Sequence, residues 1–164
     1  MSNFVSGGTA AFVRRFFIGV CVVFAIGMAP GFHQQAEANP YSIAKRYMGL
    51  HESKHNGKLR KYLGVNPRRT PWCGAFAGTV AKRAGKRVPK GHLRAANWLR
   101  AGKGVSLKNA RKGDVVVVRT KYGNHVGFYA GRKNGRVLLI GGNQSNRVKI
   151  SAYRVGSVRA VRRL

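Results

Sequence analysis

The second half of the chain contains five short runs of β-branched and apolar residues, and turn sequences such as "KYGN" and "KNG" separate them. Runs of this length and composition are typical of β-strands. The five predicted strands are "DVVVVR" (114–119), "HVGFYAG" (125–131), "RVLLIGG" (136–142), "RVKISA" (147–152) and "SVRAVRR" (157–163). Because they follow one another directly, a chain of this kind is expected to build a mainly antiparallel sheet.

The residues before these strands show helical spacing instead. Asn39 and Pro40 suit a helix N-cap and a first helical position, and "YSIAKRYM" then runs to Gly49. Three more helices are predicted: "KLRKYL" (58–63), "WCGAFAGTVAKRAG" (72–85) and "HLRAANWLRAG" (92–102). The sequence therefore predicts the α+β fold class, with N-terminal helices packed on a mainly antiparallel sheet of about five strands.

The first 38 residues have the pattern of an export signal. Arg14 and Arg15 precede the apolar stretch "FFIGVCVVFAIGMAPGF", and "AEA" (36–38) supplies small residues at both cleavage-recognition positions. An uncleaved membrane anchor is the alternative, but the apolar stretch is short for a full span and Pro30 interrupts it. We predict a signal peptide over 1–38 and a single domain over 39–164, exported to the periplasm or the cell exterior without a stable membrane span.

Net charge limits the partners that this chain can bind. The sequence has 32 basic and 3 acidic residues, a formal net charge of +29. Arg14, Arg15 and Glu37 precede the predicted cleavage site, which leaves 30 basic and 2 acidic residues, or +28, from Asn39 onward. Such an imbalance attracts polyanions, namely anionic wall polymers, anionic lipid headgroups or, without sequence specificity, nucleic acid. We expect the mature protein to be a monomer.

A single cysteine follows the predicted cleavage site. Cys21 lies in the apolar stretch, so Cys73 is the one thiol of the predicted mature chain. Because exported proteins usually pair their cysteines, a lone thiol is a buried structural residue, half of an intermolecular disulfide or a reactive group. In "TPWCGAF", Thr70 is expected to cap a helix and Pro71 to open it, which places Cys73 in the first turn. The helix dipole and the surrounding cations favour the thiolate there.

A reactive thiol needs a base, and histidine is the usual one. His125 begins the predicted strand "HVGFYAG", whereas the other three histidines of the predicted mature chain are more simply surface residues. The segment "IGGNQSN" supplies Asn143, with Gln144 beside it. A neutral amide can orient an imidazole by accepting its second N–H, so we expect one of these residues to assist His125.

The stretch "HESKH" (51–55) matches the H-E-x-x-H pattern of zinc peptidases. That pattern requires a helix, but Gly49 precedes the stretch and Asn56-Gly57 follows it, so we expect a loop between helices. A third ligand is also missing, because Glu52 is the last glutamate and Asp114 is the only aspartate of the chain. We therefore expect no zinc site at this motif, and no metal or cofactor elsewhere.

The segments "PWCGAF", "GDVVVV", "NHVGFYAG" and "GGNQSN" resemble those of the CHAP and NlpC-like cysteine peptidases and amidases that cut peptidoglycan. The resemblance extends from about "YMGLHE" to the C-terminal strand. It implies a papain-like fold in which Cys73 is the nucleophile, His125 the general base and Asn143 the orienting residue. It also implies cleavage of peptide or amide bonds in peptidoglycan. In related sequences, a Gly-x-x-Glu loop aligns with "HESKH".

The chain departs from this family pattern in two respects. It is far more basic, and it has "GGN" after the histidine strand, where the CHAP pattern often has a glutamate. Tyr62 or Trp72 is a candidate oxyanion-hole partner beside the Cys73 N–H, although both also fit core positions. Two other functions stay open: a secreted toxin or acyltransferase on the same fold, and a non-enzymatic polyanion-binding protein in which Cys73 is structural.

Overall fold

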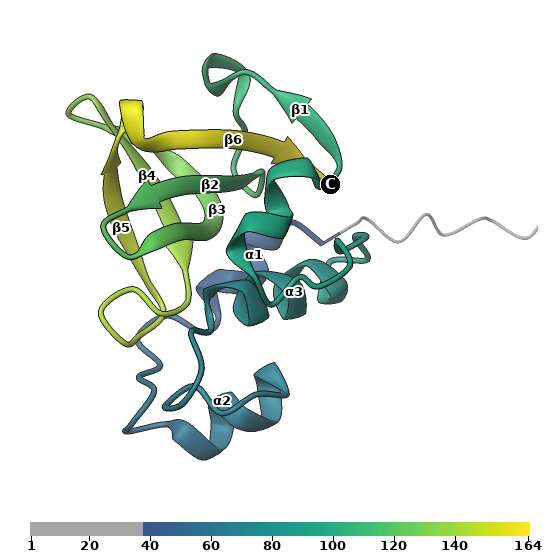
Figure 1. The fold of residues 1–164 in the computed structure, drawn as a ribbon, viewed down its shortest axis with the longest axis vertical. Coiled ribbons are helices and arrows are strands. Elements are labelled where there is room, and N and C mark those ends of the chain that lie inside the picture. The colour runs from purple at the N-terminus through teal and green to yellow at the C-terminus, as the bar shows by residue number, and fades with distance from the viewer. Residues whose placement is uncertain (1–37) are drawn as a thin grey trace, which may run out of the picture. The chain divides into compact units, whose positions relative to one another are not determined.

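The computed structural model describes residues 38–164, so the predicted signal sequence up to Glu37, with Cys21, lies outside the described residues. Four helices of the described part precede all the strands, as predicted (Figure 1). They are α1 (Pro40–Lys45), α2 (Asn56–Leu63), α3 (Cys73–Arg83) and the 3-10 helix η1 (Ala95–Arg100). Asn39 caps α1 as predicted, because its Oδ1 accepts the N–H of Tyr41 at 2.9 Å. No helix over 38–164 is long and apolar enough to cross a bilayer.

The strands form one antiparallel sheet in the order β1-β6-β2-β3-β4-β5. Their bounds are β1 (Lys103–Val105), β2 (Val115–Thr120), β3 (Gly123–Lys133), β4 (Arg136–Gly141), β5 (Lys149–Arg154) and β6 (Val158–Arg163). The α+β class, the antiparallel sheet and all five predicted strands are confirmed. The sequence does not predict β1, because "KGV" contains no apolar run; it forms by pairing with β6, where Gly104 lies opposite Arg162.

Buried side chains form separate groups on the two faces of this sheet. Val115 and Val117 of β2 belong to a buried cluster that also contains residues of all four helices named above. Val116 and Val118 face the other way and pack with residues of the strands and of the short connection around η2 (Leu107–Asn109). Because β2 is buried on both faces, its sequence is a continuous valine run and does not alternate with polar residues.

The second group of buried residues depends on the curvature of the sheet. It contains side chains from every strand of the sheet, so the sheet itself bends around them (Figure 1). Register shifts at Val117/Val118 in the β2–β6 pair and at Tyr129/Gly131 in the β3–β4 pair mark irregularities of the bulge type. Such irregularities bend a strand and increase its local twist. The curvature brings β5 towards the start of β3, where the candidate site lies.

The segment 92–102 is less helical than the sequence predicts. Only Ala95–Arg100 is helical, and as a 3-10 helix. The backbone before it passes directly over α3, so that a Cβ at Gly74 would overlap the carbonyl oxygen of Leu93. This close packing fixes His92 and Leu93 outside a regular helix and explains why position 74 has no side chain.

Candidate active site

Cys73 is the first residue of α3, so the predicted placement of the thiol in the first helical turn is confirmed. The helix nevertheless begins two residues later than predicted, and Trp72 takes the N-cap position in place of Thr70. Trp72 is fully buried, and its Nε1–H donates to Oε2 of Glu52 at 3.0 Å. These contacts anchor the chain just before Cys73, whereas Thr70 is exposed.

The three predicted site residues lie on one cleft. Cys73, His125 and Asn143 all line a cavity of about 700 Å³. The start of α3, the turn between β2 and β3, the loop after β4 and the inner residues of β5 form its walls. All three side chains therefore converge on one cleft, as the sequence predicts.

His125 lies near the start of β3, opposite Val118 of β2. Its side chain is 9% exposed, and that of Cys73 is 8% exposed. The backbone N–H of Val126, the next residue along β3, is close enough to the Cys73 sulfur to lower the pKa of the thiol. The candidate nucleophile therefore lies against the strand segment that carries the candidate base.

Burial dominates the protonation of both groups. It lowers the pKa of His125 from 6.5 to about 4. It also raises the pKa of the Cys73 thiol, against the opposing effect of hydrogen bonds from the backbone N–H groups of Val126, Gly74 and Cys73 itself. The expectation of a stabilised thiolate is therefore wrong for the free protein, because desolvation outweighs the helix terminus and the cations. Burial therefore favours the neutral form of both the thiol and the imidazole.

Tyr153 of β5 is a site residue that the sequence did not reveal. Its ring stacks on the His125 imidazole, with 5.8 Å between ring centroids and 22° between the planes. Its hydroxyl donates to Oε1 of Gln144 at 2.7 Å. Burial, followed by the nearby Cys73, raises the pKa of Tyr153 to about 12, so the hydroxyl keeps its proton. Alternation along "KISAYR" puts Ser151 and Tyr153 on one face, but nothing local indicates that this face meets His125.

Asn143 lines the cleft, but the described residues include no hydrogen bond between it and His125. The Nε2 atom of His125 is buried and has no hydrogen-bond partner among residues 38–164. Asn143 is half-buried and has a left-handed backbone, with a φ of 57°. The orienting role of Asn143 therefore stays a prediction.

The loop that carries Asn143 is held in an unusual conformation. Asn143, Ser145 and Asn146 have φ values of 57°, 52° and 62°, which residues other than glycine adopt at a cost. Gln144, 4% exposed, secures the loop from inside. Its amide nitrogen donates to three backbone carbonyls of β4 and β5, those of Leu139, Gly141 and Lys149. Its amide oxygen accepts from Tyr153, and the described residues include no hydrogen bond between Gln144 and His125.

Neither aromatic residue suggested for the oxyanion hole lines the cleft. The Tyr62 ring stacks on Tyr47 with 3.9 Å between centroids, in the core. Trp72 is fully buried, and its N–H is directed at Glu52. The polar groups that do face the sulfur are the backbone N–H groups described above.

The "HESKH" stretch forms turns ahead of α2, so the predicted loop is confirmed. Both histidine rings bind the backbone of the same stretch. Nδ1 of His51 accepts the N–H of Ser53 at 3.1 Å, and Nδ1 of His55 accepts the N–H of His51 at 3.0 Å. Over residues 38–164, no three His, Cys, Asp or Glu side chains form a group that could hold a metal ion.

Among the comparisons with known proteins, only the comparison with solved structures finds similar ones. A scan against protein-family models finds no match, and a search of curated proteins finds none. The P60 domain of Mycobacterium avium paratuberculosis antigen MAP1272c is 18% identical, with a TM-score of 0.47, over 80% of this chain and 94% of that one. The peptidoglycan hydrolase RipB of Mycobacterium tuberculosis is 19% identical, with a TM-score of 0.40, over 82% of this chain and 91% of that one.

A third similar structure is the P60 domain of antigen MAP1204 from M. avium subspecies paratuberculosis. It is 20% identical, with a TM-score of 0.38, over 54% of this chain. This chain spans 63% of that domain.

Proposed function

We propose that this protein is an exported cysteine hydrolase that cleaves peptide or amide bonds of peptidoglycan. The observation that supports it best is the position of the Cys73 thiol. It lies at the start of α3, on the same cleft as the His125 imidazole, and the backbone N–H of the residue after His125 is close enough to lower the pKa of the thiol. A nucleophile at a helix start, beside a buried base on a strand, is the arrangement that thiol acyl transfer requires.

The protonation of the site defines how the reaction begins. Since thiol and imidazole are both neutral at rest, His125 takes the thiol proton as Sγ attacks the carbonyl carbon. The carbonyl π electrons move to oxygen, and backbone N–H groups at the start of α3 stabilise the resulting oxyanion. The imidazolium then gives its proton to the leaving nitrogen as the C–N bond breaks. Water, deprotonated by His125, attacks the remaining thioester and releases the acid and the free thiol.

The charges in the cleft favour a substrate that bears carboxylates. Lys121 is the one lysine or arginine among the residues that line it, and no aspartate or glutamate is among them. The two carboxylate side chains of residues 38–164 are bonded elsewhere: Glu52 accepts from Trp72, and Asp114 pairs with Arg163 at 2.7 Å. An acidic peptide therefore meets no repulsion from a side chain of the cleft. The stem peptides of peptidoglycan, which the motif resemblance implies, have this character.

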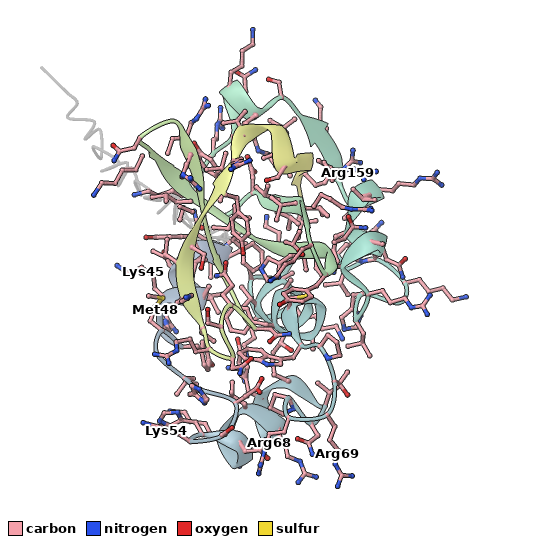
Figure 2. The ribbon with its side chains drawn as sticks, turned by 60° about the vertical axis from the view of Figure 1, so that its left-hand side comes forward. Lys45, Met48, Lys54, Arg68, Arg69 and Arg159 are labelled. Atoms are coloured by element: carbon pink, nitrogen blue, oxygen red, sulfur yellow. The ribbon has the colours of Figure 1, made fainter. Side chains whose placement is uncertain are left out.

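The charge of the whole chain supports a second activity, retention on anionic polymer. Figure 2 shows Lys45, Lys54, Arg68, Arg69 and Arg159 extending into solvent from several sides of the described chain. Because the cations are not confined to one face, binding is expected to be strong and non-specific. Retention on anionic wall polymer would concentrate the enzyme at its substrate.

Export and processing before Asn39 are part of the proposal. The small residues of "AEA" support cleavage at this position. A chain that begins at Asn39 keeps both contacts of its side chain, the cap on Tyr41 and a hydrogen bond from Nδ2 to the carbonyl of Lys112 at 3.1 Å. N-terminal sequencing of exported protein tests the site, and Met1 or Ser2 at the terminus would refute it.

Digestion of purified sacculi tests the hydrolase. The chain from Asn39 onward is incubated with sacculi, and the released fragments are identified by mass. Products that gain one water across a peptide or amide bond support hydrolysis, and their masses identify the bond. A Cys73→Ala protein that releases the same products refutes the proposal. Products joined to an added amine, without gain of water, would indicate an acyltransferase.

A further inference from the structure

We propose that Glu52, the glutamate of "HESKH", is a positioning residue. It fixes the relative position of two walls of the cleft, the start of α3 with Cys73 and the loop after β4. The inference rests on the proposed function, because it assigns the motif a part in the Cys73 site. The side-chain link comes first. Oε2 of Glu52 accepts the indole N–H of Trp72 at 3.0 Å, and Trp72 directly precedes Cys73. The carboxylate therefore binds the residue that directly precedes the proposed nucleophile.

The backbone of Glu52 supplies the second link. Residues 49–52 lie alongside residues 146–148, with an antiparallel bridge between His51 and Arg147. The N–H of Glu52 donates to the carbonyl of Asn146 at 2.9 Å, and Asn146 lines the cleft. Two further bonds, Gly49 N–H to Val148 O at 2.8 Å and Val148 N–H to Leu50 O at 2.9 Å, extend the pairing. Glu52 thus binds the loop wall by its backbone and the Cys73 wall by its side chain.

The Trp72 ring makes direct contact between these walls. A Cβ at Gly142 would overlap the six-membered ring of Trp72 and lie 2.7 Å from the Cβ of Phe76. The indole therefore packs on the backbone immediately before Asn143. Its single polar group, Nε1–H, is buried, and a buried donor left without a partner is destabilising. Glu52 removes that penalty and fixes the orientation of the ring at the same time.

The other residues of the motif form the turn that presents Glu52. The ring nitrogens of His51 and His55 accept backbone N–H groups within the turn. Nδ2 of Asn56 donates to the carbonyl of Glu52 at 3.0 Å. The H-E-x-x-H pattern has a physical basis here that involves no metal: two histidine acceptors shape a tight turn, and the glutamate between them reaches the buried indole.

This role requires a hydrogen-bond acceptor at position 52. A glutamine offers an amide oxygen of nearly the same position, so Glu52→Gln should keep the bond to Trp72, whereas Glu52→Ala loses it. A zinc peptidase would behave differently, because the glutamate of its motif acts as the general base and its amide variant would be inactive.

The test uses the two tryptophans of the chain, Trp72 and Trp98. Trp98 is also fully buried, and its Nε1–H donates to the carbonyl of His92 at 2.8 Å, away from the cleft. Trp98→Phe therefore serves as the matched control for loss of a buried indole bond. It also makes Trp72 the sole tryptophan, whose fluorescence then reports the environment of its ring.

The Glu52 variants are made in the Trp98→Phe background. Each is tested for turnover on sacculi, for the rate of Cys73 alkylation by iodoacetamide and for Trp72 emission. Urea unfolding checks that each variant is folded. Glu52→Ala should lower kcat by roughly 10- to 100-fold, as expected for a displaced nucleophile, and should change the alkylation rate and the emission maximum. Glu52→Gln should stay within about threefold of its parent in kcat and alkylation, with unchanged emission. Trp72→Phe, in a chain that keeps Trp98, should reproduce the loss in kcat and the changed alkylation rate, and it decides the question if Glu52→Ala does not fold.

A folded Glu52→Ala protein with the kcat, alkylation rate and emission of its parent would overturn the proposal, and so would a Glu52→Gln protein as impaired as Glu52→Ala. If the parent releases nothing from sacculi, the proposed function fails. Alkylation and emission then still decide whether Glu52 positions Cys73.

Discussion

The ring of Tyr153 lies nearly parallel to the imidazole of His125, 5.8 Å away, although the two residues belong to β5 and β3. Strand pairing alone would separate them, because Tyr153 pairs with Val137 of β4, and Val137 pairs with Arg132 near the far end of β3. The contact exists because the sheet curves back on itself. It covers one face of the imidazole and contributes to the burial that lowers the pKa of His125.

Replacement of Tyr153 should therefore affect the base more than the fold. In Tyr153→Ala, water reaches the imidazole, so the pKa of His125 should rise from about 4 towards 6.5 and the acid limb of kcat/KM should move up with it. Tyr153→Phe keeps the stacked ring and loses only the hydroxyl bond to Gln144, so its acid limb should stay in place. The pH profiles of both variants check this, and equal shifts in the two would contradict a role for the ring.

The wild-type protein should keep its activity in mildly acidic solution. His125 must be neutral to accept the thiol proton, and its pKa is lowered to about 4, so kcat/KM should stay level from pH 6.5 down to pH 5 and fall near pH 4. An NMR titration of His125 in a Cys73→Ala protein separates this pKa from substrate ionisation. An imidazole that titrates near 6.5 would contradict the prediction.

The same shift predicts how stability depends on pH. Between about pH 4 and 6.5, the unfolded chain binds a proton at His125 that the folded chain excludes. The free energy of unfolding should therefore rise with pH across this window, and this contribution should be complete above pH 6.5. Urea unfolding of the wild type and of His125→Gln across pH 4 to 7 measures it. The variant should have the smaller slope, and identical slopes would remove His125 as the cause.

The nucleophile and base should act as one unit. Cys73→Ala and His125→Ala should each reduce turnover on sacculi by at least about 10³-fold, and the double variant should be little worse than either, since residues of one catalytic unit are non-additive. Far-UV circular dichroism confirms that each variant is folded. An active, folded Cys73→Ala protein would exclude the thiol mechanism.

If Asn143 orients His125 as predicted, it should contribute less than His125, because a poorly oriented imidazole still has the correct protonation state. Asn143→Gly is the better probe than Asn143→Ala, since glycine adopts the φ of 57° without strain. We expect a loss in kcat of roughly 10-fold, and the matched control Asn146→Gly, at a φ of 62° in the same loop, should lose less. Equal losses would assign the effect to the loop backbone and not to the Asn143 amide.

Binding to polyanions should fall steeply with salt. The +28 charge from Asn39 onward makes counterion release a large part of the binding free energy. The affinity for polyphosphate should fall by at least about 10²-fold between 50 and 200 mM salt, and neutral dextran should not bind. An affinity that salt does not change would remove charge as the cause.

The sequence by itself determined the elements of this protein. Strands β2 to β6 follow from β-branched runs bounded by turns, and the N-cap of α1 follows from Asn39-Pro40, because these signals act between neighbours in the chain. The sequence also indicated Cys73 and His125 as a pair, since a lone thiol at a helix start and a histidine at a strand start are local patterns.

Tertiary packing decided how these parts act. The N-cap of α3 is Trp72 and not Thr70, because Trp72 is anchored by Glu52, 20 residues earlier in the chain. Burial, which only the folded chain creates, raises the pKa of the Cys73 thiol more than the nearby backbone N–H groups lower it. The ring of Tyr153 stacks on His125 only because the sheet is curved. Each of these outcomes depends on contacts between residues far apart in sequence, and local patterns carry no information about such contacts.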